Sequence, residues 1–205
     1  MRQSDIKTVV FDLGGVLIDW NPRHLYRNIF DSEADIEWFL ENITTPEWNR
    51  EQDAGRSFET AVSILQSKYP AYTKQIKAYY YRWPEMIGGE IQDSVSVLKQ
   101  VKSAGYPLYA LTNWSAQTFP MVIGKYAFFN HFDGIVVSGH EGVAKPDPEI
   151  YQVLIDRYGI DPYFTLFIDD SEPNIISAQE LGFHTIHFES SKQMKKELVQ
   201  FGVLR

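Results

Sequence analysis

Cysteine and long hydrophobic runs are both missing from this sequence. The lack of cysteine excludes disulfide bonds, thiolate metal sites and cysteine nucleophiles, and it agrees with a reducing compartment. The first apolar run stops at Asp12, and no later run reaches the roughly 18 residues that a membrane-spanning helix needs. We therefore expect neither a signal peptide nor a membrane span, and we predict a cytoplasmic protein.

Positive charge is scarce as well. Nineteen Lys and Arg face 27 Asp and Glu, which gives a formal net charge of −8. The basic residues gather only in a short run around Lys192, Lys195 and Lys196. We therefore expect no nucleic-acid partner and no binding to anionic membrane surfaces. Nothing in the composition points to an oligomeric state.

Apolar and aromatic side chains are plentiful. The chain has 205 residues, of which 44% are hydrophobic and 15% aromatic. A chain of this length can bury about 70% of the surface of its unfolded form, so it needs no covalent cross-links to be stable. We expect one globular core with a modest insertion.

Strand and helix patterns alternate along most of the chain. Short runs rich in β-branched residues, each typical of a buried strand, occupy 7–11, 107–111, 134–137, 165–168 and 184–188. Helical patterns, each closed by a glycine, occupy 91–104, 148–158 and 172–181. This alternation predicts an α/β fold built on a doubly wound parallel sheet with helices on both faces.

The segment from residue 20 to residue 89 follows a different pattern. It contains helical periodicities at 34–43, 57–69 and 72–83, and we expect no strand within it. We therefore predict a helical cap domain at 20–89, inserted into a Rossmann-like core domain formed by 1–19 and 90–205. Most of its aromatic rings are expected to form the core of the insertion itself, among them Trp20, Trp38, Trp48 and Trp83.

Polar side chains follow the predicted strands where such folds bind ligands, at the carboxyl ends of the strands. Several carboxylates at one edge repel one another unless a cation lies among them, and all-oxygen ligands suit Mg²⁺. A lysine, a hydroxyl and an amide suit the oxygens of a phosphate group, and a carboxylate can attack its phosphorus. The residues predicted at this edge are Asp12, Thr112, Asn113, Ser138, Lys145, Asp169 and Asp170.

Four segments together resemble the motifs of the haloacid dehalogenase-like hydrolase superfamily. They are Phe-Asp-Leu-Gly-Gly-Val at 11–16, Leu-Thr-Asn at 111–113, Lys-Pro-Asp-Pro-Glu-Ile-Tyr at 145–151 and Phe-Ile-Asp-Asp-Ser-Glu-Pro-Asn at 167–174. Each motif is weak alone, but all four occur in the family order across essentially the whole chain. The helical insertion resembles the first cap class of that superfamily, and Asp-Leu-Gly resembles a subgroup of small sugar-phosphate phosphatases.

The resemblance implies a role for each matching residue. Asp12 would be the catalytic nucleophile, while Thr112 and Asn113 would bind the phosphoryl group of the substrate. Lys145 would neutralise that group and orient Asp12, and Asn174 would brace the last motif. The ligands of the Mg²⁺ ion would be Asp12, the Gly14 carbonyl, Asp169 and Asp170. The expected reaction is the hydrolysis of a small phosphorylated metabolite through an aspartyl-phosphate.

The sequence departs from the superfamily pattern at Gly14. Most phosphatases of this type carry there a second aspartate, which protonates the leaving oxygen and then activates water. Three explanations stay open: a substrate with an acidic leaving group, an acid from the insertion or its border such as Asp19, Glu51 or Asp53, or the loss of turnover.

Alternative functions follow from the same residues. A phosphomutase would differ only in whether the cap excludes water, and a catalytically silent phosphate-binding module would explain Gly14. A 2-haloacid dehalogenase is disfavoured, because those enzymes lack the carboxylate pair found here at Asp169 and Asp170. Substrate selection is expected from cap residues, none of which we assign a catalytic role: Trp20, Asn21, Arg23, Trp48, Asn49, Arg50 and Gln52.

Overall fold

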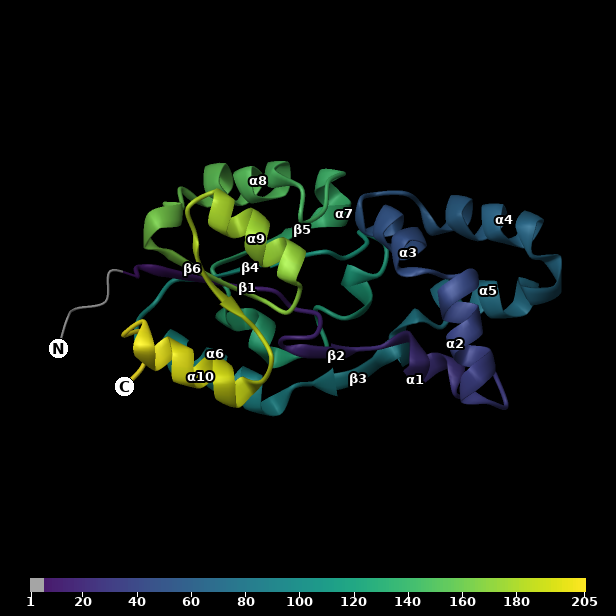
Figure 1. The fold of residues 1–205 in the computed structure, drawn as a ribbon, viewed down its shortest axis with the longest axis horizontal. Helices are drawn as coiled ribbons and strands as arrows, with labels where there is room; N and C mark the ends of the chain where they lie inside the picture. The colour runs from purple at the N-terminus through teal and green to yellow at the C-terminus, as the bar shows by residue number, and fades with distance from the viewer. Residues whose placement is uncertain (1–5) are drawn as a thin grey trace.

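A five-stranded parallel sheet forms the centre of the protein in a computed structural model that describes residues 6–205 (Figure 1). The strand order is β5-β4-β1-β6-β7, with all four pairs parallel. The strands are β1 (Thr8–Phe11), β4 (Leu108–Thr112), β5 (Gly134–Val137), β6 (Thr165–Asp169) and β7 (His184–His187). The predicted doubly wound parallel sheet is confirmed, with all five predicted strands present.

Successive residues of β1 face opposite sides of the sheet, as the period of a strand requires. Val9 and Phe11 belong to one hydrophobic cluster and Val10 to the other. Helices α6 (Gln92–Ser103) and α10 (Ser191–Gln200) cover the first side, while α8 (Pro148–Tyr158) and α9 (Glu172–Glu180) cover the second (Figure 1). Because both faces are covered, the three central strands β1, β4 and β6 are apolar runs with polar residues only at their ends.

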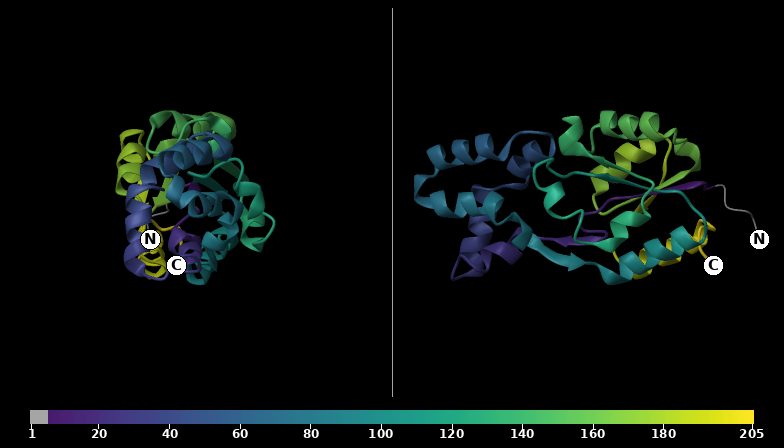
Figure 2. Two further views of the ribbon diagram at one scale, coloured as in Figure 1. Left: turned by 90° about the vertical axis from the view of Figure 1, so that its right-hand side faces the viewer. Right: turned by 180° about the vertical axis from the view of Figure 1, so that it is seen from behind.

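Five helices from the segment between β1 and β4 form a separate group at one end of the molecule (Figure 2). The C-terminus lies at the other end. Ser32, Thr45 and Ser57 accept hydrogen bonds from backbone N–H groups in the first turns of three of these helices, which fixes where each begins. The helices are α1 (Pro22–Tyr26), α2 (Glu33–Asn42), α3 (Pro46–Asp53), α4 (Phe58–Lys68) and α5 (Thr73–Tyr81).

Two strands at the borders of this insertion correct the sequence prediction. β2 (Ile18–Trp20) pairs antiparallel with β3 (Ile87–Glu90), although we predicted no strand from 20 to 89. The two glycines of β3 resemble a turn in sequence, but the ribbon requires one of them. Gly89 has a φ of +128°, a backbone conformation that other residues rarely adopt.

Short helical turns complete the fold. They are α7 (Ser138–Glu141) and the 3₁₀ helices η1 (Pro70–Tyr72), η2 (Trp83–Met86), η3 (Phe119–Met121), η4 (Ala127–His131) and η5 (Pro162–Phe164). Within residues 6–205, no helix has both the length and the apolar character needed to cross a membrane. The cytoplasmic location stays a prediction.

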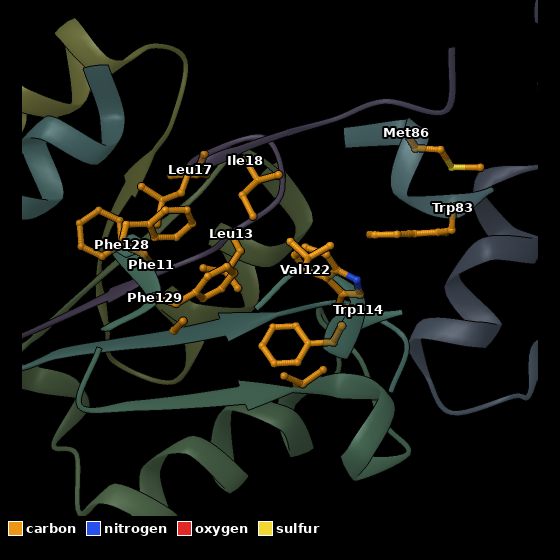
Figure 3. Packing of buried hydrophobic residues seen from close by; sticks show 14 of the residues in the cluster. Phe11, Leu13, Leu17, Ile18, Trp83, Met86, Trp114, Val122, Phe128 and Phe129 are labelled. Atoms are coloured by element: carbon orange, nitrogen blue, oxygen red, sulfur yellow. The ribbon is translucent and has the colours of Figure 1, made fainter. Parts of the chain in front are cut away.

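The tryptophans of the insertion have different surroundings. Trp48 packs edge-on against Tyr79, with ring centroids 4.9 Å apart, inside the insertion. Trp83 instead lies against Trp114 of the loop after β4, with ring centroids 5.4 Å apart (Figure 3). The expectation that these rings form the insertion's own core therefore holds for Trp48, whereas Trp83 joins the insertion to the sheet domain.

Candidate active site

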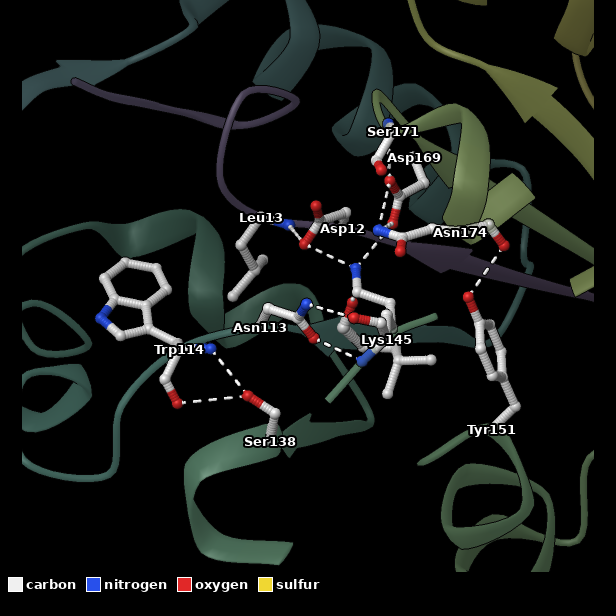
Figure 4. A network of polar contacts seen from close by, with 11 residues as sticks. Asp12, Leu13, Asn113, Trp114, Ser138, Lys145, Tyr151, Asp169, Ser171 and Asn174 are labelled. Carbon is white, nitrogen blue, oxygen red and sulfur yellow. Dashed lines mark hydrogen bonds and ion pairs between the residues drawn. The ribbon is translucent and has the colours of Figure 1, made fainter. Parts of the chain in front are cut away.

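The carboxyl ends of three neighbouring strands bring the predicted catalytic residues together (Figure 4). Asp12 follows β1, Thr112 ends β4 and Asp169 ends β6. β1 lies between the other two strands, and the backbone N–H of Asp12 donates a hydrogen bond of 2.8 Å to Ile168 O. The backbone of the sheet thus fixes the position of Asp12, independently of the contacts of its side chain.

Three carboxylates form a compact acidic cluster at this edge. Asp12, Asp169 and Asp170 each place one carboxylate oxygen within 4.8 Å of the others. Asp12 and Asp169 are buried, whereas Asp170 is exposed. Burial raises the pKa of Asp12 to about 7 against the opposing effect of Lys145, and burial together with the charge of Asp169 raises the pKa of Asp170.

Lys145 enters this cluster from the loop before α8. Its Nζ lies 2.6 Å from Asp169 Oδ2 and 3.1 Å from Asp12 Oδ1, and it donates a hydrogen bond of 2.8 Å to Leu111 O. Burial alone would lower the pKa of this fully buried side chain, but the two carboxylates raise it above its usual value. Lys145 is therefore a charged ammonium group held between two carboxylates.

The donor set fits a divalent cation. Three carboxyl groups surround a single ammonium group, so acidic groups are in excess, and the oxygen ligands are those that Mg²⁺ prefers. Burial is the main cause of the raised pKa values of Asp12 and Asp170, and the charge of the neighbouring Asp169 adds to it.

Amide side chains hold the loops around this cluster. Asn113 Oδ1 accepts a bond of 2.8 Å from Lys145 N, and Asn113 Nδ2 donates one of 2.9 Å to Lys145 O. Asn174 Nδ2 lies 3.0 and 3.1 Å from the two carboxylate oxygens of Asp169, so the expected bracing contact is present. Asn113, predicted to bind substrate, is thus engaged with the main chain of Lys145 in this conformation.

The two glycines after Asp12 differ in what they permit. Gly15 has a φ of +74°, and a Cβ atom there would lie 2.1 Å from Asp170 Oδ2. Any other residue would therefore strain the backbone and displace Asp170. Around Gly14, by contrast, no atom lies within 4 Å of a Cβ position. The structure gives no steric reason for the missing side chain at Gly14.

A cavity of about 60 Å³ separates the insertion from the sheet domain. Of the cap residues predicted to select substrate, Trp20 and Asn49 line it. The others lie elsewhere: Asn21 caps α1, Arg23 pairs with Glu37, Arg50 lines a second groove between α3 and the loop at 142–147, and Trp48 and Gln52 are buried in the insertion. The complete lining consists of Gly14, Trp20, Asn49, Asp53, Trp83, Asn113 and Trp114.

Two of these lining residues, Trp83 and Trp114, were missed in the sequence. The signal for Trp114 was its position directly after Leu-Thr-Asn, because a residue there lies at the carboxyl edge of β4. Trp83 carried no such signal, since its place depends on how the insertion packs against the sheet domain.

The family model for haloacid dehalogenase-like hydrolases matches residues 6–182 of this sequence. The chain belongs to the haloacid dehalogenase-like hydrolases. The match contains the acidic cluster, Lys145 and the whole insertion. Membership therefore agrees with the resemblance drawn from the four motifs, and the helical insertion between β1 and β4 agrees with a helical cap.

Curated relatives of this hydrolase are similar along nearly its whole length. The sesquiterpene phosphatase astK of Aspergillus oryzae is 27% identical over 197 residues, covering 96% of this chain and 97% of the relative. The D-ribitol-5-phosphate phosphatase of Bacteroides thetaiotaomicron is 24% identical over 205 residues, covering 94% and 97%. With the family model, these relatives confirm that the chain is a hydrolase of the phosphatase kind.

A solved structure extends the likeness to the site region. A haloacid dehalogenase family enzyme from Bacteroides thetaiotaomicron, crystallised with magnesium and inorganic phosphate, has a TM-score of 0.68 and 26% identity. The match covers 90% of this chain and 94% of the relative. That relative binds magnesium, and the acidic cluster of this hydrolase has the composition that such a cation requires.

Proposed function

We propose that this hydrolase is a Mg²⁺-dependent phosphatase that cleaves a small phosphorylated metabolite through an aspartyl-phosphate on Asp12. The observation that carries the proposal is the buried triad of Asp12, Lys145 and Asp169, with Asp170 beside it. A binding module would need positive charge for a phosphate, but not a carboxylate aimed at the same place. The retained carboxylate therefore favours turnover over silent binding.

The metal would be held by Asp12, the Gly14 carbonyl, Asp169 and Asp170. When bound, Mg²⁺ supplies positive charge that offsets the negative charge of the phosphoryl group. Asp169 is already oriented for this role, because Asn174 Nδ2 and the Ser171 backbone N–H donate hydrogen bonds to its carboxylate.

The residues of the chain divide the remaining work. The Asp12 carboxylate attacks phosphorus, forms a P–O bond and displaces the leaving oxygen of the substrate. Lys145 lowers the pKa of Asp12 against the effect of burial and presents positive charge to the phosphoryl oxygens, and the Thr112 hydroxyl donates to one of them. Asn113 positions Lys145 through the two bonds to its main chain. Water then cleaves the aspartyl-phosphate and restores the Asp12 carboxylate.

We further infer that the cap, residues 20–89, selects the substrate above a core domain of 1–19 and 90–205. The cavity between them has room for only a small group beside the phosphoryl site. Sugar phosphates come first among the candidates, since Asp-Leu-Gly resembles that subgroup and one relative is a D-ribitol-5-phosphate phosphatase. The tryptophans at the cavity suit the carbon skeleton of such a substrate.

Phosphate release from a panel of sugar phosphates, nucleotides and acyl phosphates, with and without Mg²⁺, tests this function. We expect metal-dependent release that falls by about 1,000-fold or more in Asp12→Asn, because the amide cannot attack phosphorus. Asp133→Asn, a carboxylate on the surface of the sheet domain, is the matched control and should keep full activity. Asp12-dependent release of halide from 2-haloacids, or transfer to a second sugar, would replace this proposal with a dehalogenase or a phosphomutase.

A further inference from the structure

The phosphatase reaction proposed above needs a proton donor that Gly14 does not provide. An alkoxide is a poor leaving group, so the P–O bond of an alkyl phosphate breaks readily only if an acid protonates the leaving oxygen. The water that cleaves the aspartyl-phosphate needs a base for the same reason. The donor must face the phosphoryl site from another part of the chain.

The structure separates the three carboxylates that could replace it. Asp19 lies 2.9 Å from His24 Nε2, at the half-exposed ribbon. Glu51 pairs with Arg56 and lines a second groove, between α3 and the loop at 142–147, whose lining does not include Gly14. Asp53 lines the cavity that also contains Gly14. Of the three, Asp53 is thus the one that faces the site.

Asp53 is held in place from both sides of the cavity. Its Oδ2 accepts a hydrogen bond of 2.8 Å from Asn49 Nδ2, and Asn49 Oδ1 accepts one of 2.8 Å from the hydroxyl of Tyr79. The backbone of Ser115, in the loop after β4, also donates to the Asp53 carboxyl. The carboxyl of this cap residue is therefore anchored next to Asn113 and Trp114 of the sheet domain.

The space above Gly14 is open to Asp53. No atom lies within 4 Å of a Cβ position on Gly14, and Gly14 and Asp53 line the same cavity. A leaving oxygen or a water molecule at Asp12 would therefore lie between Gly14 and the cap carboxyl.

The environment of Asp53 suits proton transfer near neutral pH. The other residues that line the cavity carry no formal charge, so nothing among them stabilises an ionised Asp53. Burial raises the pKa of Asp53 to about 7, which the hydrogen bond from Ser115 only partly opposes. A carboxyl group of this kind holds a proton at neutral pH and can also release it.

We propose that Asp53 is the general acid and base of this hydrolase, acting from the cap in place of the side chain missing at Gly14. The inference rests on the proposed phosphatase function. As Asp12 bonds to phosphorus, the P–O bond to the substrate breaks and the Asp53 proton passes to the leaving oxygen. Asp53 then accepts a proton from the water that attacks the aspartyl-phosphate. Phosphate leaves, and Asp12 and protonated Asp53 are restored.

A leaving-group comparison tests this role in Asp53→Asn with Mg²⁺ present. p-Nitrophenyl phosphate releases a stable anion that needs no proton, whereas D-ribitol 5-phosphate and other alkyl monoesters release an alkoxide. We expect kcat/KM to fall by about 100-fold for the best alkyl monoester and by less than about fivefold for p-nitrophenyl phosphate. The variant should also show a burst of nitrophenol, since water attack on the aspartyl-phosphate becomes slow.

Glu51→Gln is the matched control, because Glu51 lies on the same helix but lines the second groove, beside the loop at 142–147, and not the cavity at Gly14. Its kcat/KM should stay within about twofold of wild type for both substrates. Should Asp53→Asn fail to fold, Asp53→Ser removes the same carboxyl with a smaller polar group. Equal losses for both substrates, no loss for either, or a wild type that hydrolyses no alkyl monoester would each overturn the role of Asp53.

A second variant separates chemistry from structure. Gly14→Asp in the Asp53→Asn background restores a carboxyl group to the cavity from the opposite wall, where the space is open. We expect it to raise kcat/KM for the alkyl monoester at least about tenfold and to remove the burst. No rescue from a folded double variant would contradict the proposal. If wild type failed to hydrolyse p-nitrophenyl phosphate, or if Asp12→Asn kept that activity, the phosphatase function itself would fail instead.

Discussion

The sheet domain and the cap surround their buried carboxyl groups with different neighbours. On the sheet side, Lys145 lies within 3.1 Å of both Asp12 and Asp169, and amide groups hold the loops around it. On the cap side, Asp53 has only neutral partners. Burial thus raises the pKa of both Asp12 and Asp53 to about 7, but Asp12 shares a buried ammonium group whereas Asp53 has no charged partner. The difference lies in the neighbours that the fold supplies.

Removal of Lys145 should have the largest effect on this comparison. In Lys145→Met, Asp12 and Asp169 lose the ammonium group that compensates them while they stay buried. We expect the free energy of unfolding to fall by about 3–5 kcal/mol at neutral pH, measured by urea denaturation in the presence of EDTA. Saturating Mg²⁺ should recover part of this loss, since the cation offsets the same charges.

The control for this prediction is Lys102→Met. Lys102 pairs with Asp133 at 2.8 Å, but both side chains are partly exposed to solvent. Its loss should therefore cost less than about 1 kcal/mol. Similar losses in the two variants would show that burial does not increase the contribution of Lys145 to stability above that of Lys102.

Asp53 should make the protein less stable as pH rises. Its pKa in the folded state is about 7 and its ordinary value is 3.8, so the folded state binds more protons between these values. Stability therefore falls as pH rises through this window, whereas Asp53→Asn has no such dependence. By urea denaturation, we expect the variant to match wild type near about pH 4 and to exceed it by about 4 kcal/mol at about pH 8. A constant difference across this range would contradict the prediction.

Protons should compete with Mg²⁺ for the acidic cluster of the sheet domain. Burial raises the pKa of Asp12 to about 7, and a protonated carboxyl group is a poor ligand. We expect the Kd for Mg²⁺ to rise about tenfold per pH unit below 7, with proton uptake or release visible by calorimetry in two buffers of different ionisation heat. Asp12→Asn should lose this pH dependence. An affinity that is equal on both sides of pH 7 would exclude Asp12 as the titrating ligand.

The sheet domain was easier to predict than the cap, and the reason is physical. A parallel strand buried on both faces is a continuous apolar run, so its end is visible in sequence and marks the position of Asp12 or Asp169. The parallel topology then brings these ends together without further information. Lys145 was found because its loop sequence accompanies three other motifs.

The positions of the cap residues at the cavity depend on how the cap packs against the sheet domain, and no local sequence pattern reveals this packing. Helix α3 is short and largely polar in sequence, and it was not predicted. Asp53 was one of three candidate acids, and only the placement of α3 against the loop after β4 separates it from Asp19 and Glu51. The β2–β3 ribbon was missed because Gly88 and Gly89 mark a turn more often than a strand.

A surface ion pair on the sheet domain should show the smallest effect. Asp133 accepts hydrogen bonds from Lys102 Nζ and from the backbone N–H of Leu108, which lower its pKa below the ordinary value of 3.8. A lowered pKa adds stability above 3.8, and this contribution is lost as pH falls through the folded-state value. Asp133→Asn should therefore cost roughly 0.2–1 kcal/mol at neutral pH, measured by urea denaturation, and progressively less below 3.8. A loss as large as that of Lys145→Met would mean that burial, which separates the two ion pairs, does not determine how much each contributes.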